Sequence, residues 1–568
     1  MTDPSQVEAP PLYGEDEEEV VAFEGVEGSA YQELQKQRKG KRSEREQYEE
    51  AAIAGTGAPA QAPKLSFVQP HKEKRFKLFF QYEGRRGPKQ FIKVKLPKSG
   101  KFEEGPCLAL KKMFVQHYNR LRPMLSEHNV HLRSELGIAL ADDDALSGYI
   151  GYGGMVMVCD GSAPARSYMD ESSVHSWGKC AWSDQKEGDM AEPILSLDKK
   201  RIKQVVCGPE WAAVLTEGGR VLSWGVNDFG QLGTGDEDNR VLPVHTEVPY
   251  EVYINQLAAG AHFCLATTKK GELWSWGRFQ ASNFPRLFVD SWCNGYESRG
   301  EKGIRGEKVA KVQGGEQHMA AITAAGKLYT WGYNDFGQLG WGLHGVDRTG
   351  QQKPNMVKGV LEPVEVADVA CGASHTICCT KDGRLFGWGS NGAGQLNQGL
   401  LQVYNEPTEI PLPDKVVVGT LTASGYCSAF VLENAERPVM QFGKQRHEVA
   451  ANLNPDAAPV GEGQEQPKPK EEEQQGDVMG HVGGGTQLMG TNAKTVAVGE
   501  VHGLYATNAG VVYGWGYNSH MQAIGDSSKS AFVPPQPVDS MPEDWGAVQL
   551  ACSGGQSYAL MKPVRPKA

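Results

Sequence analysis

Apolar and polar positions alternate in short runs along most of this chain, and many runs end at a glycine-rich turn. Residues 221–233, Val-Leu-Ser-Trp-Gly-Val-Asn-Asp-Phe-Gly-Gln-Leu-Gly, show the pattern most clearly, because a strand-like start with two alternating faces breaks at Gly225. Residues 328–340 are a near copy, and residues 385–396 and 511–518 are weaker copies. A segment repeated at domain-scale spacing predicts an architectural unit rather than a single glycine-rich site.

Seven aromatic-glycine pairs mark the repeat, at intervals of 47 to 73 residues. The aromatic residues are Trp177, Trp224, Trp276, Trp331, Trp388, Phe442 and Trp515, and the glycines singled out after them are Gly225, Gly332, Gly389 and Gly516. A large aromatic side chain at the end of each strand predicts packing between neighbouring units. The longest interval contains residues 444–492, whose Pro, Glu, Gln and Gly predict a disordered insertion.

A second motif supports the same count. An apolar strand led by a glycine turn begins at Gly208, Gly260, Gly315, Gly372, Gly425, Gly499 and Gly554. The last copy has no Trp-Gly after it, and the first Trp-Gly has no glycine-led strand before it. We therefore expect the C-terminal strand pair to complete the unit begun at residues 174–177, which closes a ring without free sheet edges.

Ahead of the repeats, residues 72–161 predict a small α+β domain. Residues 75–82 and 91–96 form a hairpin-like pair, residues 108–121 carry apolar residues at helical spacing, and residues 155–159 form a closing strand. This order resembles the ubiquitin-like β-grasp fold, on topology and not on a motif. The first half is basic and includes Arg85 and Arg86. It is either a solvated sheet face or a docking surface for an acidic partner.

Residues 1–71 predict an extended charged arm and linker. The segment is low in aromatic residues and contains an acidic block at residues 15–19, so it cannot bury enough apolar surface to fold alone. It is either a solvated tail or an arm that orders on a partner.

Composition narrows the class of protein. A net charge of −11 argues against a mainly electrostatic nucleic-acid binder. Eleven scattered cysteines indicate buried, reduced thiols in a cytosolic or nuclear protein. The start of the chain lacks a signal-peptide pattern and no apolar run approaches 18 residues, so we expect neither secretion nor membrane spanning.

The two linked repeat motifs carry a family resemblance. Gly-x-x-His followed by Trp-Gly-x-Asn-x-x-Gly-Gln-Leu-Gly resembles the regulator of chromosome condensation repeat, over about 390 residues. The resemblance implies a seven-bladed β-propeller, here spanning residues 168–563. It also implies that His262, His318, His375 and His502 are equivalent turn residues bonded to backbone, and not metal ligands. The fold class expected is therefore mainly β, a closed seven-bladed propeller behind a β-grasp domain and an N-terminal arm.

The family includes exchange factors for small GTPases, ubiquitin ligases with an extra catalytic domain, and docking platforms. No phosphate-binding loop and no nucleophile–base pair is readable here, so we predict no enzyme, no cofactor and no catalytic or metal site. The prediction is a protein-interaction scaffold in a multi-subunit complex, cytoplasmic and in a cytoskeletal or ciliary axonemal setting, with the nucleus left open. A small-GTPase exchange factor or regulator is the alternative.

A long loop at residues 290–308 is the strongest candidate for a protruding partner contact. Its contact residues would be Trp292, Tyr296, Arg299 and Arg305, and Arg85 and Arg86 would add a contact from the small domain. A plain surface insertion is the alternative interpretation.

Overall fold

The computed structural model describes residues 21–22, 77–82, 91–95, most of 107–161, and residues 171–564 with gaps. The longest gaps in the last range are 179–190, 279–285, 292–303, 343–350 and 444–486. The described part is mainly β, as predicted, and its strands form one six-stranded and seven four-stranded sheets.

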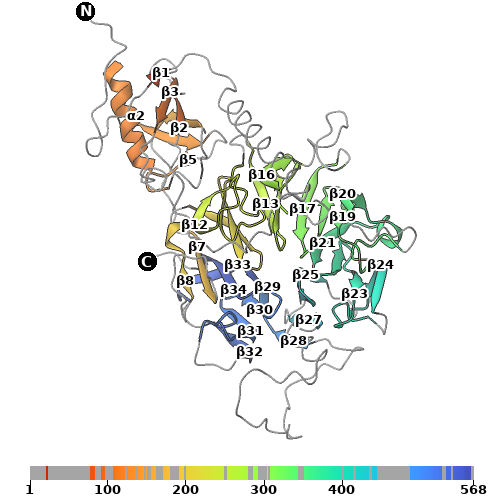
Figure 1. Cartoon of the computed structure of the whole chain (residues 1–568). Coiled ribbons are helices and arrows are strands. Elements are labelled where there is room, and N and C mark those ends of the chain that lie inside the picture. Colours follow the sequence, from red (N-terminus) through yellow and green to blue (C-terminus); the bar gives the residue numbers. More distant parts are fainter. Residues whose placement is uncertain are drawn as a thin grey trace, which may run out of the picture.

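The six-stranded sheet precedes the others in the sequence and has the strand order β1-β3-β2-β6-β4-β5. Its strands are β1 (Val21–Ala22), β2 (Lys77–Tyr82), β3 (Phe91–Lys95), β4 (Val130–Ser134), β5 (Ala139–Leu140) and β6 (Met155–Asp160). Strands β2 and β3 form the predicted antiparallel hairpin, whereas β2 and β6 run parallel. Helix α2 (Cys107–Leu121) buries Leu110 and Phe114 in one core with Val130 and Val158. Figure 1 shows this unit, in red and orange, beside the other sheets.

The seven four-stranded sheets follow one another along the chain, and we number them in that order. Sheet 1 contains β9 (Ile202–Cys207), β10 (Trp211–Thr216), β11 (Val221–Gly225) and β12 (Arg240–His245). Sheet 2 contains β13 (Ile254–Ala259), β14 (Phe263–Thr268), β15 (Leu273–Gly277) and β16 (Arg286–Ser291). Sheet 3 contains β17 (Val309–Gly314), β18 (His318–Thr323), β19 (Leu328–Gly332) and β20 (Gln351–Met356). Sheet 4 contains β21 (Val366–Cys371), β22 (His375–Thr380), β23 (Leu385–Ser390) and β24 (Val403–Ile410). Sheet 5 contains β25 (Val418–Ser424), β26 (Cys427–Leu432), β27 (Val439–Gly443) and β28 (Gln487–Gly490). Sheet 6 contains β29 (Ala493–Val498), β30 (His502–Thr507), β31 (Val512–Tyr517) and β32 (Phe532–Pro537). Short 3-10 helices, η3 (Leu195–Leu197) and η4 (Gly359–Leu361), lie in two of the connections.

Sheet 7 joins the two ends of this region. It consists of β33 (Trp545–Ser553), β34 (Gln556–Pro563), β7 (Ser173–Gly178) and β8 (Glu192–Pro193). Strand β34 pairs antiparallel with β7, and Ser557 lies opposite Trp177. This pairing confirms the prediction that the C-terminal strand pair completes the unit begun at residues 174–177.

The seven repeated aromatic side chains are all buried, and each packs between its own sheet and the preceding one. Trp224 of sheet 1, for example, shares a core with Val174 and Leu560 of sheet 7, and its ring lies edge-on to Tyr558 at 5.8 Å. Aromatic residues bury about 150–250 Å² each, so these seven side chains supply much of the contact between sheets.

Glutamines tie the first strands of neighbouring sheets together. Gln549 of β33 accepts a hydrogen bond from the Val205 N–H at 3.0 Å and donates to the Val205 carbonyl at 3.1 Å. Gln204 makes the same pair of bonds to Leu257, each at 2.8 Å. First strands of different sheets do not form a ladder, so these amides satisfy backbone groups that would otherwise lack partners.

One ion pair connects the small unit to sheet 1. The Arg201 Nε lies 3.2 Å from Asp144 Oδ1, and the Arg201 guanidinium lies 6.0 Å above the Tyr149 ring. Both Asp144 and Tyr149 are fully buried. Arg201 has a positive φ of 47°, a conformation that costs a non-glycine residue about 1 kcal/mol or more.

Candidate functional site

The loop after the third strand of a regular sheet is fixed by its own side chains. In sheet 3, Asn334 Oδ1 accepts from the Leu339 N–H at 3.0 Å and Gln338 Oε1 accepts from the Phe336 N–H at 2.9 Å. The same two bonds recur in the equivalent loops of sheets 1, 4 and 6. The repeated Asn and Gln are therefore loop-building residues, and they hold the intervening pair of positions in a defined place.

The final glycine of this loop faces the next aromatic residue. Gly340 has φ +73°, and a Cβ there would lie 2.7 Å from Nε1 of Trp388 in the next sheet. Only glycine allows both this backbone conformation and this approach. The repeated motif of residues 221–233 and 328–340 thus comprises a strand, a loop held by its Asn and Gln side chains, and a glycine that contacts the next sheet.

The two positions inside the loop frame carry the variable side chains. They are Asp228 and Phe229 in sheet 1, Asp335 and Phe336 in sheet 3, Gly392 and Ala393 in sheet 4, and Ser519 and His520 in sheet 6. Phe336 is 44% exposed, although large apolar side chains elsewhere in the seven sheets are mostly buried. An aromatic side chain held in solvent by a rigid loop is typical of a protein-binding anchor.

Sheet 2, which has lost the loop motif, contributes a cation to the same side of the molecule. The Arg278 guanidinium lies 5.0 Å from the Phe229 ring, which is itself 4.5 Å from the His262 ring. The Arg278 N–H donates to the His262 carbonyl at 2.9 Å, which fixes its backbone beside the turn. Phe229, His262 and Arg278, which we call the aromatic–cation cluster, combine side chains from a regular and a divergent sheet.

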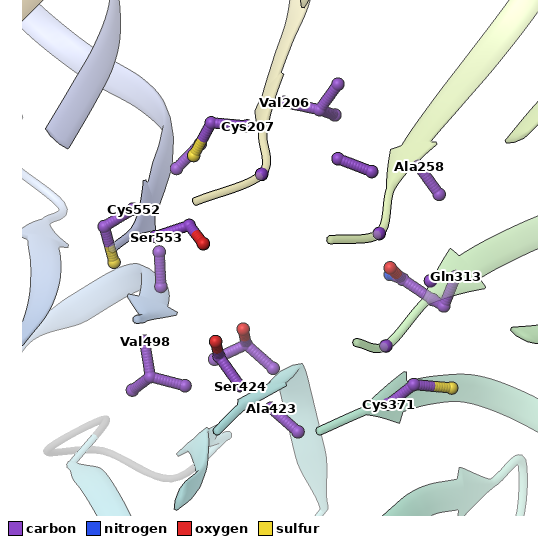
Figure 2. Close-up of a pocket in the computed structure, with 18 of the residues that line it drawn as sticks. Val206, Cys207, Ala258, Gln313, Cys371, Ala423, Ser424, Val498, Cys552 and Ser553 are labelled. Carbon is purple, nitrogen blue, oxygen red and sulfur yellow. The ribbon is translucent and has the colours of Figure 1, made fainter. Parts of the chain in front are cut away.

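A central channel opens on this side. The first strands of all seven sheets line a cavity of about 360 Å³. Figure 2 shows Cys207, Cys371 and Cys552 on three of these strands, with Ser424 and Ser553 nearby.

The glycine-led turns form the rim of the channel. Their backbones touch from sheet to sheet: the Glu316 N–H donates to the Gly372 carbonyl at 3.2 Å, and the Ala373 N–H donates to the Gly425 carbonyl at 2.8 Å. A Cβ at Gly315 would lie 2.4 Å from the Gly372 oxygen, so the close contact requires glycine there. Glu316 and Glu500 also line the cavity and add negative charge.

Two of the channel thiols, those of Cys371 and Cys552, are poorly suited to nucleophilic chemistry. Burial raises the pKa of the Cys371 thiol to about 12 and raises that of Cys552 as well. The thiolate is the reactive form, and these thiols remain protonated at neutral pH. Within the described residues, no group of three His, Cys, Asp or Glu side chains is arranged to hold a metal ion.

Three of the four repeated histidines are structural, but their bonds differ from the prediction. His318, His375 and His502 are fully buried, and each Nε2 contacts a hydroxyl of the next sheet, on Thr376, Ser428 and Ser557, at 2.7 to 2.9 Å. The Ser428 hydroxyl donates to the Gln395 carbonyl, so it accepts the proton from His375 Nε2–H. The prediction named backbone partners, and a backbone hydrogen bond at Cys427 does contribute at His375. The hydroxyl partners were not predicted, because the Ser428 hydroxyl lies on the neighbouring sheet, 53 residues away in the chain.

His262 does not belong with them. It is exposed, and Phe263 occupies the position equivalent to His318 at the start of the second strand. The turn in sheet 2 places its histidine one residue earlier, which frees the imidazole to join the aromatic–cation cluster.

The partner contacts predicted from the sequence cannot be placed. Trp292, Tyr296, Arg299 and Arg305, as well as Arg85 and Arg86, lie outside the described residues. Sequence reasoning had passed over Phe229, Phe336 and Arg278. The signal that could have identified Phe229 and Phe336 is an aromatic residue between Asp and Gly in a loop that otherwise needs only Asn and Gln.

No helix in the described part of the chain has the length and apolar character needed to cross a bilayer.

Comparison with known proteins places these features in context. A family model for the RCC1-like domain matches residues 173–560. The ultraviolet-B receptor UVR8 of Arabidopsis thaliana is 31% identical over 248 residues, which cover 42% of this chain and 54% of the receptor. The human E3 ubiquitin-protein ligase HERC2 is 34% identical over 227 residues, which cover 39% of this chain and 4% of the ligase. The chain thus spans about half or less of the length of these relatives.

Solved structures agree on the fold. Prp20p from Saccharomyces cerevisiae, in a structure described with its binding to Gsp1p and histones, superposes with a TM-score of 0.54 at 20% identity, over 70% of this chain and 92% of that one. Human WBSCR16 superposes with a TM-score of 0.51 at 19% identity, over 70% of this chain and all of that one.

Proposed function

Because this chain belongs to the RCC1-like domain family, we propose that it is a non-catalytic docking protein whose loop-bearing face binds a protein partner. The face consists of the loops that carry Asp228, Phe229, Asp335 and Phe336, together with Arg278. The observation that carries the proposal is the exposed Phe336 on a loop frame that Asn334 and Gln338 hold rigid. Rigid aromatic anchors bind with little loss of side-chain entropy, which is why they dominate interface energetics.

The architecture that presents this face is a seven-bladed propeller at residues 168–563. The pairing of β34 with β7 and the core clusters shared by successive sheets support a closed ring. The small unit at residues 72–161 is a β-grasp module, which is supported by its parallel β2–β6 pair and the packing of α2 on the sheet. The predicted disordered insertion at residues 444–492 ends too late, because Gln487–Gly490 form β28, the fourth strand of sheet 5. Residues 444–486 and nearly all of the predicted arm at residues 1–71 lie outside the described residues.

The ring and the module would provide separate contacts within a multi-subunit complex. Linked contacts raise the overall affinity when both can engage at once. A cytoskeletal or ciliary axonemal setting remains a prediction from the sequence.

A paired substitution tests the docking face. Phe336→Ala should reduce partner affinity by roughly tenfold or more, because an anchor residue contributes about 2 kcal/mol or more. The matched control is Leu242→Ala, which removes a side chain of similar exposure, 48%, from the outer strand β12. Affinity-purified complexes from cells expressing each variant report the loss. Equal partner recovery with both variants would contradict the proposed face, provided that the two proteins melt at the same temperature.

Regulation of a small GTPase is the second candidate function. It is supported by the similarity to Prp20p, a protein described as binding Gsp1p, a small GTPase, and histones. At 20% identity that similarity concerns the fold, so the activity itself is the hypothesis. Sub-stoichiometric amounts of this chain should then accelerate release of a fluorescent guanine nucleotide from one member of a GTPase panel. No acceleration across the panel would exclude this alternative. The ligase activity of HERC2 is not carried over, because the match covers 4% of that protein.

A further inference from the structure

Two loops on the same side of the seven sheets carry the same pair of side chains in different surroundings. Asp228 and Phe229 in sheet 1 are equivalent to Asp335 and Phe336 in sheet 3, since each pair lies inside a loop held by the same Asn and Gln bonds. Both aspartates are exposed. Phe229 is half-buried, whereas Phe336 is 44% exposed.

Each of these loops packs on the next sheet in the same way. A Cβ at Gly277 of sheet 2 would lie 3.2 Å from the Cα of Gln231 in the sheet 1 loop. A Cβ at Gly389 of sheet 4 would lie at the same distance, 3.2 Å, from the Cα of Gln338 in the sheet 3 loop. The residue after each glycine donates its N–H to the carbonyl just before the second strand, at 2.9 Å in sheet 2 and 2.7 Å in sheet 4. The neighbours of the two phenylalanines can therefore be compared position by position.

The next sheet covers one phenylalanine and leaves the other open. In sheet 2, the His262 ring lies 4.5 Å from the Phe229 ring, and the Arg278 guanidinium lies 5.0 Å from it. A guanidinium over an aromatic face is attracted by the negative potential of the ring. In sheet 4, the equivalent positions carry Ser374 and Ser390. Serine is too short to cover the ring as arginine does, which accounts for the greater exposure of the sheet 3 ring.

The surface beside Phe336 also favours a cation. Asp335 is exposed in the same loop, and Glu406 is exposed on β24, the outer strand of sheet 4. This strand meets the end of the loop, where the Gly342 N–H donates to the Asn405 carbonyl at 3.0 Å. Residues 333–342 and strands β22, β23 and β24 include no lysine or arginine. A cation from a partner would therefore meet carboxylates and no positive charge from these segments.

We propose that Phe336, Asp335 and the two serines of sheet 4 form a subsite that receives an arginine side chain of the protein partner. The guanidinium takes the place over Phe336 that Arg278 takes over Phe229, and it donates hydrogen bonds to the Asp335 carboxylate. Arginine suits this place better than lysine, because its planar group stacks on an aromatic ring and donates several hydrogen bonds at once. The subsite depends on the proposed docking function and names the side chain that the docking face receives.

Fluorine NMR on the full-length chain tests the subsite with a small probe. A para-fluorophenylalanine at position 336 reports on that ring during titration with N-acetylarginine amide at constant ionic strength. Its signal should shift saturably, and the neutral N-acetylcitrulline amide should bind about fivefold more weakly, because the cation–π attraction is lost. Asp335→Asn should weaken arginine binding about threefold. The same label at position 229 should respond only after Arg278→Ala, since Arg278 holds that place in wild type. Equal binding of both amides at position 336, or no saturable shift at either position, would overturn the subsite.

Supplying the guanidinium within the chain tests whether the partner uses this subsite. Ser390→Arg recreates the arrangement of Arg278, and if the new side chain covers Phe336 in about 90% of molecules, partner affinity should fall about tenfold. Ser519→Arg is the matched control, because it adds the same charge at an exposed position in the equivalent loop of sheet 6. Partner recovery should stay at the wild-type level with this control. Equal recovery with both variants, at equal melting temperatures, would overturn the subsite.

The variants also separate the subsite from the docking function. Loss of the partner with Phe336→Ala, but not with Ser390→Arg, would keep the docking face and overturn its arginine. Saturable arginine binding at position 336, combined with full partner recovery by Phe336→Ala, would keep an arginine-binding site and contradict the proposed docking function.

Discussion

The buried histidines between sheets make the ring sensitive to acid, and His375 gives the sharpest test. Its side chain is fully buried, its Nε2–H donates to the Ser428 hydroxyl at 2.9 Å, and burial lowers its pKa to about 3. His318 and His502 have the same surroundings, and burial lowers each pKa to about 3. The imidazole is therefore neutral in the folded chain throughout the range in which a free histidine titrates.

Proton linkage sets the sign and size of the effect of pH on the free energy of unfolding. The folded pKa, about 3, lies below the unfolded value of 6.5, so the unfolded chain takes up a proton that the folded chain rejects. The free energy of unfolding then falls as the pH drops from about 6.5 toward 3. At pH 5 the loss is about 2 kcal/mol for each such histidine. Three of them would remove about 6 kcal/mol, which is comparable to the whole stability of many domains.

Urea denaturation at pH 7.5 and pH 5, followed by tryptophan fluorescence, measures this loss. His375→Gln keeps an N–H donor of similar reach but does not titrate, so wild type should lose about 2 kcal/mol more than this variant between the two pH values. Ser428→Ala is the control, because it removes the hydroxyl and leaves the imidazole in place. It should lower stability by about 1 kcal/mol at both pH values and keep the wild-type pH dependence. The same pH dependence in His375→Gln and wild type would refute the buried neutral histidine.

Three further predictions concern stability and coupling. Gly332→Ala should lower the free energy of unfolding, measured by chemical denaturation, by about 4 kcal/mol, because φ is +107° and a Cβ would lie 2.6 Å from a carbonyl oxygen. Gly394→Ala is the control: φ is +78° but the surrounding space is open, so the free energy of unfolding should fall by only about 1 kcal/mol. Equal costs would contradict the close approach. Gln549→Met should speed amide hydrogen exchange at Val205 by tenfold or more, since a hydrogen bond of about 1.4 kcal/mol is lost, and an unchanged rate would show that another group holds this amide. Arg201→Ala should increase protease cleavage between the small unit and sheet 1, because the ion pair with the buried Asp144 carboxylate is lost. An unchanged cleavage pattern would mean that other contacts hold the two units together.

The sequence predicts the local features of this fold well, because they are encoded in short windows. The period-2 alternation at residues 221–225 identifies the strand, and the glycines mark positive φ at positions such as Gly225. The mismatched first and last repeats predict the β34–β7 pairing, since an incomplete unit at each end leaves one arrangement that removes both edges.

The contacts between repeats were not predictable in the same way. The Thr376 hydroxyl that meets His318 lies 58 residues further along the chain, and no pattern within one repeat identifies it. His262 and His318 each follow a glycine-led turn in the sequence. His262 comes one residue earlier in its turn than His318 does, and it is exposed whereas His318 is buried. Arg278, the residue directly after β15, lies over the Phe229 ring because sheets 1 and 2 are packed against each other. Such juxtapositions depend on how sheets stack, which the sequence of a single sheet does not encode.

Quantitative affinity purification of the full-length chain from its own cells tests the docking function most directly. Wild type and Leu242→Ala should each recover one partner in near-equimolar amount, and Phe336→Ala should lose most of that partner while keeping its melting temperature. Recovery of no partner in near-equimolar amount, combined with acceleration of nucleotide release from a small GTPase by trace amounts of the chain, would contradict the docking function and favour the regulator.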